Sequence, residues 1–218
     1  MFSLDRLVAA LPELAGGAAT TVALTLCAAL VSWLGGIAVG ALQLSPLAPA
    51  RWAARLYVSF MRGTPALVQL FIIFFALPLL GIKVPPFVAA ALTLGLNSAA
   101  YVGEILRAGL AAVPTGQIEA AEAIGMSRLD IWRRVRLPQA ISLSLAPLAN
   151  ELTLLLKTTP LASVVAVTDL TFAGQIIVAR TFQPVEVLTA VAVAYVLAGQ
   201  SLLQTARWLE RRSQGRGA

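Results

Sequence analysis

The sequence has no histidine, a single cysteine and few charged residues. Charged side chains make up 12% of the 218 residues, about half the share of roughly 25% in an average soluble protein. Without histidine, the chain lacks the most common metal ligand and the most common general base. The one cysteine, Cys27, excludes an intrachain disulfide. We therefore expect no catalytic residue and no metal site.

Apolar residues make up 59% of the chain, more than the interior of a water-soluble fold of this size could hold. A bilayer is the solvent that explains such a composition. The positive charges stand at the ends of apolar runs, where they indicate membrane topology, so no nucleic-acid partner is expected. The sequence thus predicts an all-α integral membrane protein.

Five uncharged or nearly uncharged runs are long enough to cross a bilayer, which takes about 20 residues. They are residues 21–42, 63–82, 84–103, 137–156 and 187–206. A shorter run, 170–179 within 168–180, is predicted to be re-entrant or interfacial. The first run has no clear basic leader and precedes other spans, so no cleavable signal peptide is expected. No Walker-type phosphate loop is present, so ATP hydrolysis by this chain is not expected.

The basic residues are distributed unequally between the two sides of these predicted spans. Twelve of the sixteen fall on one side. They are Arg51, Arg55, Arg62, Arg107, Arg128, Arg133, Arg134, Arg136, Arg207, Arg211, Arg212 and Arg216. The other side holds Arg6, Lys83, Lys157 and Arg180. The positive-inside rule places the twelve in the cytoplasm, which predicts five transmembrane helices with the N-terminus outside and the C-terminus in the cytoplasm.

The polar segment 114–138 joins the third and fourth predicted spans and has a regular pattern. Thr115 is a candidate N-cap for a helix over 117–124, and Gly125 suits a left-handed helix end. Ser127 and Asp130 resemble a capping box, and Pro138 opens the next span. The pattern predicts a helix, a sharp turn and a second short helix on the cytoplasmic surface. On physical grounds alone, an amphipathic interfacial hairpin explains it equally well.

The same segment resembles the EAA loop found in permease subunits of ABC importers. The match comprises Glu119, Ala120 and Ala121, then Gly125, and then residues 135–138, with valine at 135 where the family usually has isoleucine. The resemblance implies a coupling helix that docks into a groove of a separate ATP-binding cassette ATPase, which would bind the ATP and Mg. The coupling residues that it implies are Glu119, Ala120, Ala121, Ala123, Gly125, Met126 and Ser127.

Three other segments, 62–70, 97–107 and 154–164, resemble permeases for polar amino acids such as histidine, arginine and glutamine. The likeness covers nearly the whole chain. It implies a single transmembrane domain over residues 1–218, of the type I importer fold, in the bacterial cytoplasmic (inner) membrane among its lipids. It also implies a second permease subunit, identical or a sister chain, and an extracytoplasmic substrate-binding protein.

Two carboxylates, Glu104 and Glu151, lie at or within predicted spans, where an ionised side chain costs about 2.5–3.5 kcal/mol on insertion scales. Glu104 has Arg107 one turn away, so an ion pair is expected. Glu151 has no cation three or four residues away within its span. We expect it to contact the ammonium group of a substrate; the alternative is an internal hydrogen bond between helices.

Helical spacing places Asn97, Tyr101 and Glu104 on one face, and Glu151 and Thr158 on another. The predicted substrate pathway consists of Asn97, Tyr101, Glu104, Asn150, Glu151, Leu154 and Thr158. In arginine-type relatives, positions matching Asn97, Glu151 and Thr158 help to line a pocket, and the last is often aspartate. The threonine here argues against a strictly arginine-like preference.

The sequence therefore predicts the permease subunit of an ATP-driven importer of polar amino acids, with cationic ones among the candidates. It would form half of the pathway and perform no catalysis. The alternative is a stand-alone secondary transporter or channel for small polar solutes, against which the coupling loop argues. A membrane anchor or assembly factor is a third reading, against which the intramembrane Glu151 argues.

Overall fold

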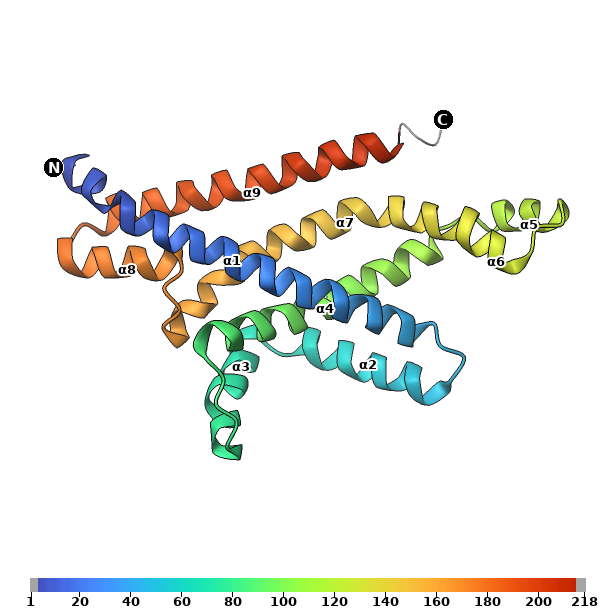
Figure 1. The fold of residues 1–218 in the computed structure, drawn as a ribbon, viewed down its shortest axis with the longest axis horizontal. Coiled ribbons are helices and arrows are strands. Elements are labelled where there is room, and N and C mark those ends of the chain that lie inside the picture. The colour runs from blue at the N-terminus through green and yellow to red at the C-terminus, as the bar shows by residue number, and fades with distance from the viewer. Residues whose placement is uncertain (1–3, 215–218) are drawn as a thin grey trace.

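The computed structural model describes residues 4–214, and all regular structure in that range is helical (Figure 1). Side chains are described for residues 10–205 and for Trp208. The helices are α1 (Leu4–Gln43), α2 (Ala48–Gly63), α3 (Ala66–Phe71), α4 (Pro86–Ala111), α5 (Thr115–Ala123), α6 (Arg128–Asp130), α7 (Leu137–Thr158), α8 (Leu170–Thr181) and α9 (Pro184–Gln214). Shorter helical turns of other pitch are η1 (Ile72–Ala76), η2 (Leu77–Leu80), η3 (Ile131–Arg136) and η4 (Thr159–Val165). The predicted all-α class is confirmed.

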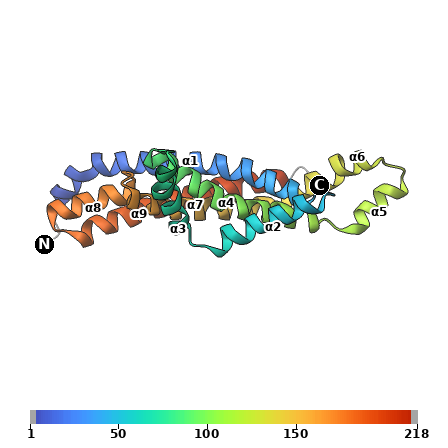
Figure 2. The same cartoon turned by 90° about the horizontal axis from the view of Figure 1, so that it is seen from below.

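The long helices α1, α4, α7 and α9 run side by side along the length of the molecule (Figure 1). Viewed at right angles, they form a flat layer (Figure 2). Helices α5 and α6 lie at one end of this layer, and α8 lies at the other end with the N-terminus. The polar loop and the short apolar helix are therefore separated by the length of the bundle.

Four helical stretches are long and apolar enough to cross a membrane: Ala10–Gln43, Pro86–Ala111, Arg128–Val165 and Pro184–Thr205. They overlap the predicted spans 21–42, 84–103, 137–156 and 187–206, which are thereby confirmed as helices. The short run at 170–179 is also helical, as α8, and packs against α1 and α9.

The predicted second span, residues 63–82, is wrong as a single straight helix. Helix α2 ends at Gly63, and the stretch Ala66–Leu80 follows at an angle of 104° to it. The break lies at Thr64, which is extended (φ −119°, ψ 144°) because a residue that precedes proline disfavours the helical region. The stretch then projects from the bundle as an arm, seen below it in Figure 1.

The arginines predicted in a cytoplasmic connection before this span also need correction. Arg51, Arg55 and Arg62 all belong to α2, which packs against α1 and α4. The apparent connection is itself a helix, because its apolar positions, among them Ala54 and Val58, are buried on one face. The bent pair of α2 and the arm is a fifth candidate span.

A further correction concerns residues 128–138. The structure has no separate short helix before the fourth span, because α6, η3 and α7 follow one another without a break from Arg128 to Thr158. Pro138 lies in the first turn of α7, but it does not open the helix, because the helical turn η3 directly precedes α7. The end of the polar loop and the fourth span are therefore one continuous rod.

Small residues bring α1 and α4 into close contact. They recur every four residues as Ser32, Gly36 and Gly40 in α1 and as Gly95, Ala99 and Gly103 in α4. A Cβ atom added at Gly36 would lie 2.3 Å from Cγ1 of Val102, and one added at Gly95 would lie 2.8 Å from the carbonyl oxygen of Ala28. Membrane helices approach this closely where glycine, alanine or serine lines their contact.

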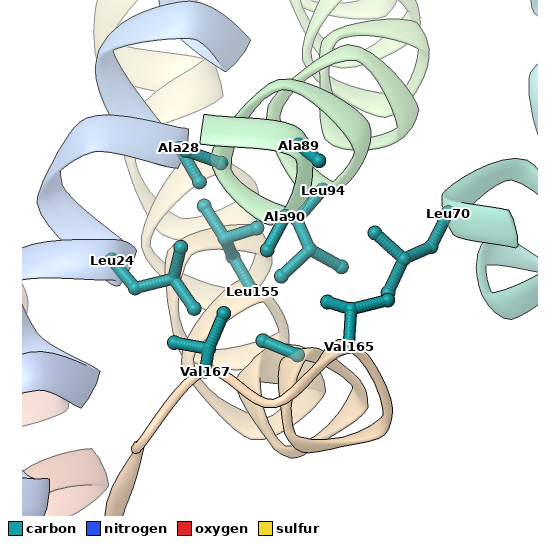
Figure 3. Packing of buried hydrophobic residues seen from close by; sticks show 11 residues of the cluster. Leu24, Ala28, Leu70, Ala89, Ala90, Leu94, Leu155, Val165 and Val167 are labelled. Carbon is teal, nitrogen blue, oxygen red and sulfur yellow. The ribbon is translucent and has the colours of Figure 1, made fainter. Parts of the chain in front are cut away.

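Buried apolar side chains hold α1, α3, α4, α7 and the segment after α7 together (Figure 3). The cluster includes Leu24, Ala28, Leu70, Ala89, Ala90, Leu94, Leu155, Val165 and Val167. Leu70 fixes the base of the arm in this cluster, whereas Leu79 at its far end is 86% exposed. The arm is anchored at one end only.

We expect Gly36→Val to destabilise the protein, because its side chain would overlap Val102 and force α1 and α4 apart. Overpacking of this kind typically costs about 1–3 kcal/mol. The melting temperature of the purified protein in detergent measures the effect. Gly16→Val is the matched control, since no atom lies within 4 Å of a Cβ added there. Equal melting temperatures for the two variants would contradict the close contact.

The distribution of basic residues predicts the orientation in the membrane. Five of the arginines used in that prediction lie outside the residues whose side chains are described: Arg6, Arg207, Arg211, Arg212 and Arg216. With Cys27 replaced by alanine, a cysteine at Lys83 should react with an impermeant maleimide in intact cells. A reporter fused after Arg212 should read cytoplasmic. Labelling at position 83 only after the membrane is broken would overturn the orientation.

Candidate functional site

A cavity of about 240 Å³ opens between the base of the arm, α4 and α7. It is lined by Ala66, Leu94, Asn97, Ser98, Tyr101, Glu151, Leu154, Leu155 and Thr158. The structure thus brings together five of the predicted pathway residues: Asn97, Tyr101, Glu151, Leu154 and Thr158. Glu104 and Asn150 are not among the lining residues.

Each of the two long helices contributes one face with the same spacing. The α4 residues are Leu94, Asn97, Ser98 and Tyr101, and the α7 residues are Glu151, Leu154, Leu155 and Thr158. Both sets follow the i, i+3, i+4, i+7 pattern of a single helical stripe. Helix α7 continues to Thr158, so the cavity is formed where two such stripes face each other.

Glu151 is nearly buried, at 9% exposed, and holds one hydrogen bond. The Ser98 hydroxyl donates to Glu151 Oε1 at 2.7 Å, and Ser32 in α1 donates to Ser98 at 2.9 Å. The internal hydrogen bond foreseen as the alternative is therefore present. Within the described residues, however, no cation pairs with Glu151, and its Oε2 atom accepts no hydrogen bond. One carboxylate oxygen remains available to a ligand.

Asn97 connects the cavity wall to the bend between α2 and α3. Its Nδ2 atom donates to the Met61 carbonyl at 2.9 Å and to Gln69 Oε1 at 3.1 Å. Gln69 in turn donates to the Thr64 hydroxyl at 2.7 Å and to the Met61 carbonyl at 3.1 Å. The side chains of Asn97 and Gln69 therefore satisfy backbone groups that the break in the helix leaves free.

Next to the bend, Arg62 contacts Tyr101, a residue that lines the cavity. Its guanidinium carbon lies 5.1 Å from the centroid of the Tyr101 ring, within the range of a cation–π interaction. Tyr101 lines the cavity, so Arg62 is one side chain removed from its lining. As part of a predicted connection between spans, Arg62 was not expected to lie near Tyr101.

Glu104 and Asn150 lie elsewhere. Arg107 donates to Glu104 Oε2 at 2.9 Å, so the expected ion pair is present, and Gln43 donates to Glu104 Oε1 at 2.6 Å. These contacts join the ends of α1 and α4 away from the cavity lining. Asn150 is exposed on the side of α7.

Ser32, Gln69 and Ser98 were missed by the sequence analysis, although each contacts a residue of the cavity or lines it. Ser32 and Gln69 are polar side chains inside predicted spans, which is a signal that was available. Their partners lie far along the chain: Ser98 is 53 positions from Glu151 and 66 from Ser32. Spacing along a single helix does not reveal such pairs.

A second buried carboxylate, Asp169, lies outside the cavity, before α8. It is fully buried, accepts a hydrogen bond from the Phe172 N–H at 2.8 Å and accepts another from the Tyr195 hydroxyl at 3.1 Å. Burial raises the pKa of Asp169 above its ordinary value, while these hydrogen bonds lower it in part. The carboxylate caps α8 and attaches it to α9.

At the opposite end of the molecule, α5 ends in a left-handed turn at Gly125 (φ +78°), as predicted. The N–H of Gly125 bonds the Glu122 carbonyl at 2.9 Å, and the N–H of Met126 bonds the Ala121 carbonyl at 3.1 Å. This pair of bonds is a Schellman motif. Ser127 then caps α6 by accepting from the Asp130 N–H at 3.2 Å, which confirms the predicted start.

The predicted N-cap of α5 is wrong by one residue. The helix begins at Thr115, and Pro114 occupies the cap position, with extended ψ 132°. Among the predicted coupling residues, Ala121 is buried and Met126 is half-buried, whereas Glu119, Ala120, Ala123, Gly125 and Ser127 are exposed. The exposed residues face away from the body of the molecule together with Ile124, which is 78% exposed.

Comparison with known proteins gives consistent matches. Residues 32–215 match the family model described as "Binding-protein-dependent transport system inner membrane component". The probable amino-acid ABC transporter permease protein YckA of Bacillus subtilis (strain 168) is 41% identical over 175 residues, 78% of this chain and 77% of the relative. The glutamine transport system permease protein GlnP of Escherichia coli (strain K12) is 36% identical over 195 residues, 87% of this chain and 89% of the relative.

A solved structure, described as an amino acid ABC transporter with histidines, has a chain that matches the fold with a TM-score of 0.92. That chain is 34% identical, and the match covers 97% of this chain and 99% of the other. The similarity of fold therefore extends over almost the whole chain.

Proposed function

Because the chain belongs to the family of binding-protein-dependent transport system inner membrane components, we propose that its cavity admits polar amino acids, cationic ones included. The chain is the non-catalytic, multi-pass inner-membrane permease subunit of an amino-acid ABC importer. Its family depends on a substrate-binding protein and an ATPase subunit.

The free oxygen of Glu151 is the observation that carries the substrate proposal. A buried carboxylate without a cation is unfavourable, because its hydration is lost and only Ser98 replaces it. An ammonium group on a bound ligand would supply the missing partner. Four other lining residues would surround the ligand: Asn97 with an amide, Thr158 with a hydroxyl, Tyr101 with a phenol and Leu154 with an apolar side chain.

We assign ATPase docking to α5 and the turn after it. This end exposes Ile124 (78%) and Leu129 (63%), two apolar side chains that a protein groove would cover. The partner ATPase would bind ATP and Mg, and this chain would receive only its motion. The docking residues are the predicted coupling residues Glu119, Ala120, Ala121, Ala123, Gly125, Met126 and Ser127, which lie in the cytoplasm in the proposed orientation.

The continuous rod from Arg128 to Thr158 links docking to the cavity. Its first residues follow the coupling turn, and Glu151 stands near its far end. A displacement of the turn therefore moves the α7 face of the cavity against α4. The π-helical turn η3 and Pro147 inside α7 are the places where the rod can bend.

We propose a second permease subunit, identical or a sister chain, as the occupant of the space beside the arm. The arm leaves the bundle at 104° to α2 and exposes Leu79 (86%) and Leu80 (75%) at its end. Two such subunits would enclose the pathway between their cavities. The binding protein would deliver the amino acid from the outer side.

Glu151→Gln should weaken uptake, because it keeps the shape of the side chain and removes the charge that meets the ligand ammonium. A charge-assisted hydrogen bond is worth roughly 1.5–3 kcal/mol, or about ten- to a hundredfold in affinity. Uptake of neutral and cationic amino acids by the reconstituted complex measures the change. Thr158→Asp, on the same face, should shift preference towards dibasic amino acids.

As controls, the expression, assembly and basal ATP hydrolysis of the Glu151→Gln complex should stay near those of the wild type. A purely structural Glu151 would give a lower melting temperature and an unchanged selectivity profile in the residual transport. That result would place the substrate site elsewhere.

Gly125→Val should uncouple ATP hydrolysis from uptake while leaving the protein inserted. A β-branched residue is strained at φ +78°, so the turn that orients α5 would be lost. Gly116→Val is the control, because Gly116 lies in α5, the helix before this turn, does not have a positive φ and has no atom within 4 Å of an added Cβ. Full transport by Gly125→Val would show that the loop does not transmit the motion.

A further inference from the structure

The cavity has a carboxylate, Glu151, in its wall and an arginine, Arg62, stacked on a second lining residue, Tyr101. We propose that Arg62, stacked on Tyr101, binds the α-carboxylate of the transported amino acid while Glu151 binds its ammonium group. The residues that line the cavity include no lysine or arginine, but one of them, Tyr101, is in contact with Arg62. The assignment rests on the proposed function, since it requires an amino acid in this cavity.

The backbone of Arg62 is held at the cavity by its neighbours. The carbonyl of Met61, the preceding residue, accepts hydrogen bonds from both Asn97 (2.9 Å) and Gln69 (3.1 Å). Asn97 also lines the cavity, and Ala66, four residues after Arg62, lines it from the other side of the bend. Arg62 is therefore part of a fixed corner and not of a free surface helix.

Arg62 faces away from the side of α2 that suits lipid. Trp52, Leu56 and Phe60 recur every four residues and are 67%, 54% and 50% exposed, which marks the lipid side. Arg55 and Arg62, seven residues apart, share a different face. Arg62 lies about 16 Å further along α2 than Arg51, at 1.5 Å per residue. Arg62 is exposed on this face, so its charged group is open to a polar partner.

The stacking leaves the binding groups of Arg62 unused. A cation–π contact occupies the face of the guanidinium, whereas its N–H groups point outward in the plane. In the described part of the chain, these N–H groups donate no hydrogen bond and form no ion pair within 4 Å. Glu104 attracts Arg62 from a distance but is already bonded to Arg107 and Gln43. A planar fork of free donors matches a carboxylate.

A zwitterion would thus meet opposite charges at both ends. Its ammonium group would reach Glu151 Oε2, and its carboxylate would reach Arg62 at the edge of the Tyr101 ring. The pair selects for a free amino acid over its decarboxylated amine, which keeps every other group. Comparing the two ligands therefore separates the contribution of Arg62 to binding from that of the other residues of the cavity.

Direct binding to the permease–ATPase complex in nanodiscs, without the binding protein, tests the assignment. The ligands are L-arginine and L-histidine, each paired with its decarboxylated counterpart, agmatine and histamine. Arg62→Met should weaken binding of the amino acids by about ten- to a hundredfold and leave the amines unchanged. Arg62→Lys should restore part of the loss, because it keeps the charge without the fork. Arg55→Met, on the same face of α2, should change neither ligand class.

If Arg62→Met weakened the binding of amino acids and amines equally, the assignment would be overturned. A lower melting temperature with an unchanged ratio of amino-acid to amine affinity would also overturn it. Either result would make Arg62 a structural partner of Tyr101 and Glu104. Failure of the proposed function gives a different pattern. In that case Glu151→Gln leaves amine binding unchanged, or the wild-type complex binds none of the four ligands. Either outcome means that the cavity is not the substrate site, and the assignment to Arg62 is then wrong as well.

Discussion

The close contact between α1 and α4 is the constraint on which the cavity depends. In lipid no hydrophobic force draws apolar helices together, so packing and hydrogen bonds between helices must do so. Glycines at 36, 95 and 103 allow the two backbones to approach, and that approach lets the Ser32 hydroxyl reach Ser98 at 2.9 Å. Ser98 then holds Glu151 on α7. A larger residue in this contact would separate α1 from α4 and remove the first bond of the chain that orients the carboxylate.

The bend at Thr64 is the second constraint, and it changes what the surrounding charges mean. As a straight span, residues 63–82 would carry Arg62 at the membrane surface, where an arginine needs no special explanation. The turn of 104° instead leaves Arg62 beside α4, with its guanidinium over Tyr101. Asn97 and Gln69 stabilise this arrangement because they bond the Met61 carbonyl and the Thr64 hydroxyl. Asn97, which lines the cavity, and Gln69, which supports it, thus also supply hydrogen bonds to groups that lose theirs where the helix breaks.

What could be predicted from the sequence were the features that repeat locally. Apolar runs gave the long helices, Gly125 gave the turn after α5, and i, i+4, i+7 spacing put Asn97 with Tyr101 on one face. The proline at 65 was a signal for the bend, but hydropathy over 63–82 outweighed it. Contacts between distant segments could not be found in this way: nothing along one helix indicates that Ser32 reaches Ser98, or that Arg62 reaches Tyr101. Those pairs exist because of how closely the helices pack.

The charges around the cavity follow from the cost of placing ions in lipid. Glu104 is neutralised within the chain by Arg107, one helical turn away, and by a hydrogen bond from Gln43. Within the described residues, Glu151 and Arg62 form no ion pair of this kind. Both instead hold neutral contacts, a serine hydroxyl and an aromatic ring, that orient them without satisfying their charge. Such contacts fix direction at low cost and leave the electrostatic interaction to be completed by a ligand. A zwitterion completes both interactions at once, and neither an anion nor a simple cation can do so.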